Sequence, residues 1–310
     1  MRQRLDSEQL QMSANQSGYC AGTTKRRRRS KAQIRQLDKQ IVGVLRRDNP
    51  QSVRHVFYLM TNPRLPEPVE KSESGYRTVQ NRCLRLRRDG VVPYSWISDS
   101  SRMGYHTNTY AGAGDYLSHM AGFYRGELWK RDDVPSFCEV WCESRSLAGT
   151  LIDLCDELAV SLYPAGGFTS ASFAYRAAEV LNAQGQTKVF YVGDFDPAGV
   201  LIDVCLEREL RRHLESGVEL DFERIAITKE QIEEYDLPTK PRKPGDRRAL
   251  HIEETVEAEA MPAGVMRSLL RRCIEGLLPE GALDVVRVAE QSERDHILRM
   301  ATLLKSREQK

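Results

Sequence analysis

The 310-residue sequence predicts an α/β protein, in which a small helical module precedes a parallel sheet flanked by helices. Two observations predict this class. Apolar residues recur at helical spacing between residues 31 and 88, and after residue 136 short apolar strands alternate with amphipathic helices. Regular alternation of strand and helix is typical of a parallel sheet with helices on both faces. A chain of this length has room for two domains of ordinary size.

The N-terminal elements are three short helices. The first begins at Lys31 and ends before Asp48, because its apolar residues fall on one face and a proline follows. Ser52 is placed to cap the second, Val53 to Leu59, and the third spans residues 76–88. Residues 91–97 then read as a short wing-type strand. Three helices and a β-turn element, rich in arginine, predict a winged-helix module over 31–103, although many small helical domains share this outline.

The C-terminal part supplies the sheet. Residues 104–135 are rich in Gly, Tyr and Asp and are expected to be a connector, and residues 136–310 form the second domain. Strands are predicted at 137–143, 161–164, 188–194 and 224–228. Helices are predicted at 147–159, 171–185, 197–216, 262–278 and 282–308. The remaining segment, 236–248, is a Pro-rich basic loop.

Charge is distributed unevenly along the chain. The formal net charge is only +2, but residues 1–130 carry 23 Lys and Arg against 11 Asp and Glu. Residues 131–310 carry 23 against 33, so a basic half precedes an acidic one. The basic run 25–31 lies in a segment, 1–30, that lacks periodicity and is predicted to be a basic disordered arm. Such a run is either a solvated tail or an arm that follows DNA.

Composition also bears on the compartment. No apolar run reaches the length of a membrane span, and the N-terminus has no signal-peptide core. The seven cysteines are an odd number without framework spacing, so we expect reduced thiols in a cytoplasmic protein. Cys138 and Cys142 are separated by three residues and no CxxC pair accompanies them, which argues against zinc.

Three carboxylates mark a candidate metal site. In an open parallel sheet, binding groups collect at the carboxyl ends of the strands, where Glu143, Asp194 and Asp196 are expected. Side chains two positions apart on an extended segment point the same way, so both aspartates can meet one cation. Converging carboxylates repel unless neutralised, and their hard oxygens suit Mg²⁺. Pro197 is expected at the first position of the next helix. Gly193 has no side chain and would let backbone or a phosphate approach closely. The alternative is that Asp196 only caps that helix and Asp194 lines a solvated turn.

These motifs carry a resemblance. A strand ending in Glu, followed by GDFDPAG, resembles the Toprim domain shared by topoisomerases, primases and some nucleases. The chain looks most like the A subunit of topoisomerase VI and the eukaryotic meiotic double-strand-break protein, over roughly residues 35–275. Its small size and RIAITKEQIEEYDLPTKPRK resemble the stand-alone Mini-A proteins of mobile genetic elements. The family implies a winged-helix (catabolite-activator-like) domain followed by a Toprim domain. Through VRHVFY at residues 53–58 it also implies Tyr58 as nucleophile, and Glu143, Asp194 and Asp196 as metal ligands.

The residues around Tyr58 also bear on whether it can act as a nucleophile. A phenol is a weak nucleophile unless its oxyanion is stabilised, and Arg54 lies four residues earlier on the same helix face. A guanidinium can hold a phosphate bidentately and favour the phenolate. His55 is either a general base or a core residue. The alternative for Tyr58 is a core aromatic with a hydrogen-bonded hydroxyl.

Other positions carry weaker signals. Asp99, Ser101 and Arg102 follow the predicted wing strand, where they either contact phosphate or form a turn. The run 166–170, with Gly166, Gly167, Thr169 and Ser170, is either a phosphate-tolerant loop or a plain strand-to-helix turn. The acids at 257 and 259 either add to the metal site or begin a solvated helix.

The expected function is that of a type IIB topoisomerase-like DNA-cleaving enzyme, an isomerase-type transesterase. The resemblance implies that Tyr58 attacks double-stranded DNA to leave a 5′-phosphotyrosyl link, with Mg²⁺ assisting. It also implies a homodimer that makes staggered breaks, the tyrosine of one protomer working with the metal of the other. The basic N-terminal tail replaces the segment expected to dock an ATPase subunit, so an ATPase partner is possible but not required. Two alternatives are a metal-dependent hydrolytic nuclease with a structural Tyr58, and a DNA-binding protein without catalysis.

Overall fold

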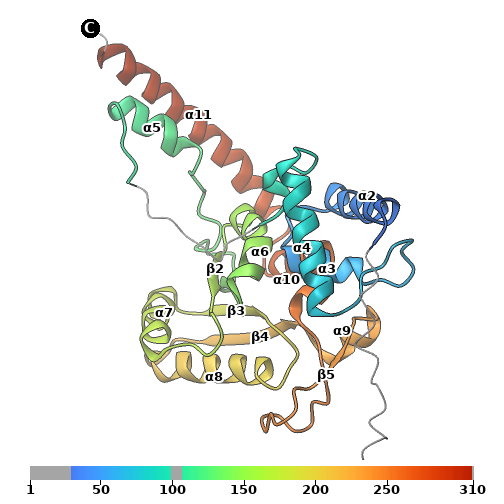
Figure 1. The fold of residues 1–310 in the computed structure, drawn as a ribbon. Coiled ribbons are helices and arrows are strands. Elements are labelled where there is room, and N and C mark those ends of the chain that lie inside the picture. The colour runs from blue at the N-terminus through green and yellow to red at the C-terminus, as the bar shows by residue number, and fades with distance from the viewer. Residues whose placement is uncertain (1–28, 99–106, 309–310) are drawn as a thin grey trace, which may run out of the picture.

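A four-stranded parallel sheet forms the centre of the fold (Figure 1). The computed structural model describes residues 29–98 and 107–308. The strand order is β2-β1-β3-β4, and every neighbouring pair is parallel. The strands are β1 Phe137–Cys142, β2 Ser161–Pro164, β3 Thr187–Val192 and β4 Leu220–Ala226. The α/β class expected from the alternating sequence pattern is therefore confirmed.

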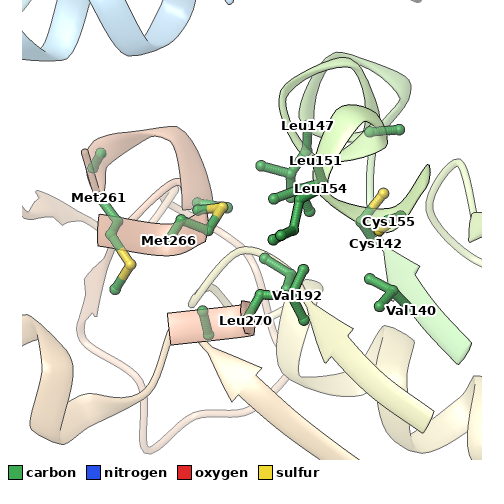
Figure 2. Close-up of a cluster of buried hydrophobic side chains, with 14 of the residues drawn as sticks. Val140, Cys142, Leu147, Leu151, Leu154, Cys155, Val192, Met261, Met266 and Leu270 are labelled. Atoms are coloured by element: carbon green, nitrogen blue, oxygen red, sulfur yellow. The ribbon is translucent and has the colours of Figure 1, made fainter. Parts of the chain in front are cut away.

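Helices cover both faces of this sheet. They are α6 Arg145–Glu157, α7 Ala171–Gln184, α8 Gly199–Arg212 and α10 Ala263–Glu275. Trp141 of β1 and Tyr191 of β3 are fully buried in a cluster with side chains of α7 and α8. Val140 and Cys142 belong to the opposite cluster with α6 and α10, as alternate strand residues must (Figure 2). Each buried apolar side chain of Val or Leu size contributes about 1.5–3 kcal/mol, so the sheet is anchored from both sides.

The N-terminal helices share this core. They are α2 Lys31–Arg47, α3 Val53–Met60 and α4 Glu73–Arg88, with the predicted Ser52 cap accepting from the His55 N–H. The cluster that contains Val140 and Cys142 also contains buried residues of all three helices. Arg267 of α10 fastens the junction, because it donates to the carbonyls of Pro50 and Thr150 and pairs with Asp48. The two predicted modules therefore pack as one body.

The predicted wing strand is wrong. Residues 91–97 contain a short 3₁₀ helix, η1 Tyr94–Trp96, and only Ile97 forms an isolated bridge, with Gln51. Pro93 precedes η1 and has no N–H to donate to a neighbouring strand. The apolar residues of this segment, Val92 and Ile97, are buried in the core instead.

The expected connector contains a helix, α5 Ala113–Ala121, which the Gly-rich sequence concealed. It lies beside the long C-terminal helix α11 Ala282–Glu308 (Figure 1). Gly114 allows this approach, since a Cβ there would stand 2.8 Å from the Ala301 carbonyl oxygen. None of the helices in residues 29–98 and 107–308 is long and apolar enough to cross a membrane.

Small elements follow the sheet. They are α9 Lys229–Glu234, β5 Lys240–Pro241, β6 Glu254–Thr255 and η2 Ala258–Ala260. The antiparallel pair β5–β6 closes a hairpin over the Pro-rich basic loop. Val256 then bridges back to Phe195, and α3 packs on η2. This return segment brings the sheet and the N-terminal helices to one place.

Candidate active site

The three predicted carboxylates stand at the carboxyl ends of neighbouring strands. Glu143 follows β1, and Asp194 and Asp196 follow β3. The loop after β3 is tightly folded and depends on two glycines. A Cβ on Gly193 would lie 3.0 Å from Glu143 Oε2, and one on Gly199 would lie 2.2 Å from the Asp194 carbonyl oxygen. The absence of a Cβ at Gly193 therefore leaves room for the Tyr191 ring as well as for the Glu143 carboxylate.

Backbone N–H groups hold one oxygen of each carboxylate. Glu143 Oε2 accepts from the Asp194 N–H at 2.9 Å, and Asp194 Oδ1 accepts from the Ala258 N–H at 2.8 Å. Asp196 Oδ1 accepts from the N–H groups of Ala198 and Gly199 at 2.8 and 2.6 Å. Asp196 thus binds backbone N–H groups at the start of the next helix, which begins at Gly199 with Ala198 as its N-cap and not at Pro197 as expected. In the described ranges, the second oxygen of each carboxylate carries no hydrogen bond.

Arg224 of β4 holds the shape of this loop. Its guanidinium donates to the carbonyl oxygens of Gly193 and Asp194 at 3.1 and 3.2 Å, and to that of Gly199 at 2.7 Å. Its Nε donates to Asp203 of α8 at 2.5 Å. A single, largely buried cation therefore ties β3, β4 and α8 together beneath the two aspartates.

The carboxylate cluster places like charges close together in a largely buried site. Burial raises the pKa of Glu143, and Asp196 raises it further. Burial and the neighbouring Glu143 likewise raise the pKa of Asp194. Buried like charges are costly, and a divalent ion between hard oxygen donors removes that cost.

Two criteria decide whether Glu143, Asp194 and Asp196 fit Mg²⁺: the chemistry of their donor atoms and the positions of those atoms. The chemistry fits, because carboxylate oxygens are preferred ligands of Mg²⁺ and the raised pKa values of Glu143 and Asp194 reflect buried negative charge. Over the part of the chain that the structure describes, however, no group of three His, Cys, Asp or Glu side chains is arranged to hold one metal ion. The backbone hydrogen bonds leave one oxygen each on Glu143, Asp194 and Asp196, and these are the atoms that would have to turn toward a metal.

Tyr58 lines a separate cavity of about 370 Å³ beside this cluster. Its ring is only 5% exposed, on the face of α3 that it shares with Arg54. The lining is Arg54, Phe57, Tyr58, Lys71, Ser72, Glu73, Tyr76, Lys240 and Glu257. Lys71 and Lys240 lie over the Tyr58 ring, with their Nζ atoms 5.8 and 5.6 Å from its centroid. The cavity therefore gathers three cations around one phenol.

Glu257 is the acceptor among these cations. Arg54 Nη1 donates to Glu257 Oε2 at 2.8 Å, and Lys240 Nζ donates to Oε1 at 2.6 Å. The Tyr58 hydroxyl and this carboxylate line the same cavity, and each shifts the pKa of the other. Burial raises the pKa of Glu257, but Lys240, Arg54 and Tyr58 outweigh it and lower the net value. Glu257 is therefore ionised at neutral pH.

Tyr58 itself is protonated. Burial raises its pKa well above the ordinary value, Glu257 raises it further, and Arg54 opposes the change. Burial and the nearby Lys240 lower the pKa of Lys71 to about 8. A phenol in this environment becomes a nucleophile only if its proton is removed as it reacts.

His55 does not reach this cavity. It is fully buried, and its Nδ1 lies 3.0 Å from the Ser52 hydroxyl oxygen. Burial and Arg267 lower its pKa to about 3, so the ring is neutral. Of the two expectations for His55, the structure supports the core residue.

The segment 256–259 joins the two sites. Asp194 accepts from the N–H of Ala258, next to Glu257, which pairs with Arg54 and lines the Tyr58 cavity. Glu259 is buried, and burial raises its pKa while Arg54 lowers it. Glu257 therefore does precede a helix, as the N-cap of η2, whereas Glu259 is buried and the expectation of a solvated position is wrong for it.

A second hollow extends the site. It measures about 610 Å³ and shares Arg54 and Tyr76 with the Tyr58 cavity. From there it runs along α4 to the loop after β1, lined by the polar side chains of Gln80, Asn81, Arg87, Ser98, Ser144, Ser146 and Glu259. Polar side chains thus continue from Tyr58 toward the carboxylate cluster.

The remaining candidates divide between turns and undescribed residues. Gly166 and Gly167 have φ of 71° and 91°, and their N–H groups donate to the Glu143 carbonyl. Ser170 caps α7, so this run is a strand-to-helix turn. Asp99, Ser101 and Arg102 lie outside the described residues, as does the arm up to residue 28.

Sequence reasoning missed two cations and the role of one acid. Lys71 precedes α4 and Lys240 lies in a two-residue strand, and no local pattern marks either. Glu257 carried a weak signal as one of two acids before a helix. No protein-family model matches the chain, and comparison with the curated proteins gives no match.

Proposed function

We propose that the chain is a DNA-cleaving transesterase of the type IIB topoisomerase A-subunit kind, with a winged-helix-like module followed by a Toprim-like domain. The observation that carries the proposal is the meeting of Tyr58 with Arg54, Lys71 and Lys240 in one cavity. A phenol among cations, beside a carboxylate cluster at the strand ends, suits attack on a phosphodiester.

The residues of the cavity have distinct roles in this proposal. Arg54 is partly exposed and offers a planar guanidinium to two oxygens of a DNA phosphate. Tyr58 attacks phosphorus and leaves a 5′-phosphotyrosyl link and a free 3′ hydroxyl. Lys71 and Lys240 place positive charge near the attacked phosphate, where they would stabilise the negative charge that develops in the transition state.

Glu143, Asp194 and Asp196 would hold Mg²⁺ through their remaining oxygens. When bound, the ion anchors phosphate oxygens and stabilises charge on the leaving oxygen. Arg224 keeps the loop that carries both aspartates in place through its bonds to three backbone carbonyls.

DNA is the substrate class that the surface favours. Helix α4 carries the exposed Arg77, Arg85 and Arg88 together with Gln80 and Asn81. The second hollow runs from this helix past Arg54. Arginine on phosphates with amide side chains on base edges is a common way to bind duplex DNA. Two-fold related strands suit a homodimer, which we include in the proposal.

A hydrolytic nuclease is the second candidate, and one observation favours it. Tyr58 is 5% exposed and its pKa is raised by burial and by Glu257, as in a structural tyrosine. In that case water attacks the phosphate and no protein–DNA bond forms.

One gel separates the two candidates. Protein, supercoiled DNA and Mg²⁺ are incubated, denatured and resolved with and without protease. A protein-linked DNA band that Tyr58→Phe abolishes supports the transesterase. Cleavage that survives Tyr58→Phe without any such band supports the nuclease.

A further inference from the structure

Glu257 occupies a position that a DNA phosphate also needs. Its two oxygens take hydrogen bonds from Arg54 at 2.8 Å and from Lys240 at 2.6 Å. Both cations line the Tyr58 cavity, together with Lys71. A carboxylate and a phosphodiester are alternative anionic partners for a guanidinium and an ammonium group.

The same carboxylate lines the Tyr58 cavity, where it raises the pKa of the Tyr58 hydroxyl. Among the acids that line the Tyr58 cavity, Glu73 pairs with Arg77 at 2.5 Å, which leaves Glu257 as the candidate base for this hydroxyl. Glu259 is buried on the side of the second hollow. His55, the other base considered for the reaction, faces the core.

The two relationships point to one sequence of events. While Glu257 is bound by Arg54 and Lys240, these partners stabilise its ionised form and weaken it as a base. A phosphate that takes over both cations leaves the carboxylate without its two ion pairs, in the same cavity as Tyr58. It then accepts a proton more readily, at the moment when the nucleophile is needed.

We propose that Glu257 is the catalytic residue that takes the Tyr58 proton, and that a DNA phosphate releases it for this task by replacing it on Arg54 and Lys240. This inference rests on the proposed transesterase function.

The step balances without another reactant. The Tyr58 oxygen forms a bond to phosphorus, and the bond from phosphorus to the 3′ oxygen breaks. The Tyr58 proton moves to a Glu257 oxygen. The 3′ oxygen takes a proton from solvent, and Glu257 returns its own to solvent, so no net proton or electron is gained or lost.

Two measurements on Glu257→Gln test the inference. The first is the rate of covalent adduct formation with saturating DNA, which should fall about 100-fold or more. The second is the affinity for DNA in the non-cleaving Tyr58→Phe background. Here adding Glu257→Gln should tighten binding several-fold, because the competing carboxylate charge is gone. A merely structural role would weaken both quantities together.

Matched variants complete the design. Glu257→Asp keeps the charge and should recover part of the adduct rate. Glu254→Gln removes an exposed acid from β6, on the same hairpin, and should leave both quantities at their wild-type values. Thermal melts of every variant establish that it is folded.

The outcomes are separable. Slower adduct formation with tighter binding supports the inference. Adduct formation by Glu257→Gln at the wild-type rate overturns it, and so does a joint loss of binding and cleavage that Glu257→Asp does not repair. If the wild-type protein forms no adduct while it still binds and cuts DNA, the proposed function itself has failed.

Discussion

Arg54 and Glu257 form an ion pair of 2.8 Å although 203 positions of sequence separate them. Both side chains are partly exposed, at 44% and 27%, and surface pairs of this kind contribute about 0–1 kcal/mol to stability. The pair therefore contributes little to folding stability, and its main effect is to position Glu257 beside the residues of α3. It brings the segment after the sheet against Tyr58, within one residue of the backbone N–H that holds Asp194.

The carboxylate cluster predicts a magnesium-dependent stability. In EDTA at pH 8, Asp194→Asn should unfold at a higher temperature than the wild type. Its free energy of unfolding should be larger by about 1 kcal/mol or more. The substitution removes a charge whose pKa burial and Glu143 raise, and an amide oxygen can still accept from Ala258. Mg²⁺ should then stabilise the wild type and not Asp194→Asn, as scanning calorimetry can measure.

The matched control for that prediction is Asp132→Asn, which removes an exposed carboxylate away from the strand ends. It should respond to Mg²⁺ as the wild type does. Equal stabilisation of Asp194→Asn by Mg²⁺ would show that Asp194 is not a ligand.

Glu139 predicts a pH dependence of folding. It is 1% exposed, its Oε2 accepts from Trp141 Nε1 at 2.9 Å, and burial raises its pKa from 4.5 to about 7. A carboxyl whose pKa is raised in the fold favours the folded state below pH 4.5, and this contribution is lost as pH rises through 7. The stability of Glu139→Gln relative to wild type should therefore rise over this range, by up to about 3 kcal/mol.

Urea unfolding at a series of pH values measures this difference. Above pH about 8 the difference should level off, because Glu139 is then ionised in both states. Parallel stability curves for the two proteins would mean that Glu139 stays neutral or finds a compensating partner.

The basic arm predicts a salt effect on DNA binding. Deleting residues 2–28 removes six Lys and Arg but keeps Arg29, which pairs with Glu67 at 2.9 Å, and Ser30, which caps α2. The slope of log affinity against log salt should become shallower by about 0.9 for each DNA phosphate that the deleted side chains neutralise. Adduct formation at saturating DNA should not change.

Replacing residues 25–28 with glutamine is the matched control, since it keeps the length of the arm and removes four of the charges. It should give an intermediate slope. If both variants keep the wild-type slope, the arm does not touch DNA.

A mixing experiment addresses the shared sites implied by the resemblance. Tyr58→Phe and Asp196→Ala proteins, each inactive alone, should recover nicking when mixed dimers form, because one site then has an intact tyrosine and an intact metal cluster. Tyr58→Phe mixed with Glu257→Gln should stay slow, because Tyr58 and Glu257 meet within one chain. If the first mixture does not recover nicking although mixed dimers are present, each whole site lies within a single protomer.

The elements with regular apolar periodicity could be predicted from the sequence, whereas those that depend on distant contacts could not. Strand ends are readable because a buried run such as VFYV must stop where charged residues begin, which located Asp194. Lys71, Lys240 and Glu257 come from irregular segments, and only the return of residues 256–260 onto α3 brings them together. The predicted wing strand was wrong because two buried apolar residues, Val92 and Ile97, flank a 3₁₀ helix after Pro93, and the apolar pattern does not distinguish this from a strand.

The most direct test of the central claim is to identify the atom that joins protein to DNA. The wild-type protein is incubated with DNA and Mg²⁺, and the adduct is digested with nuclease and trypsin for peptide mass spectrometry. The account predicts a nucleotide attached through its 5′ phosphate to Tyr58, in the peptide that follows Arg54. A nucleotide on another residue, or cleaved DNA with free 5′ phosphates and no modified peptide, would contradict it.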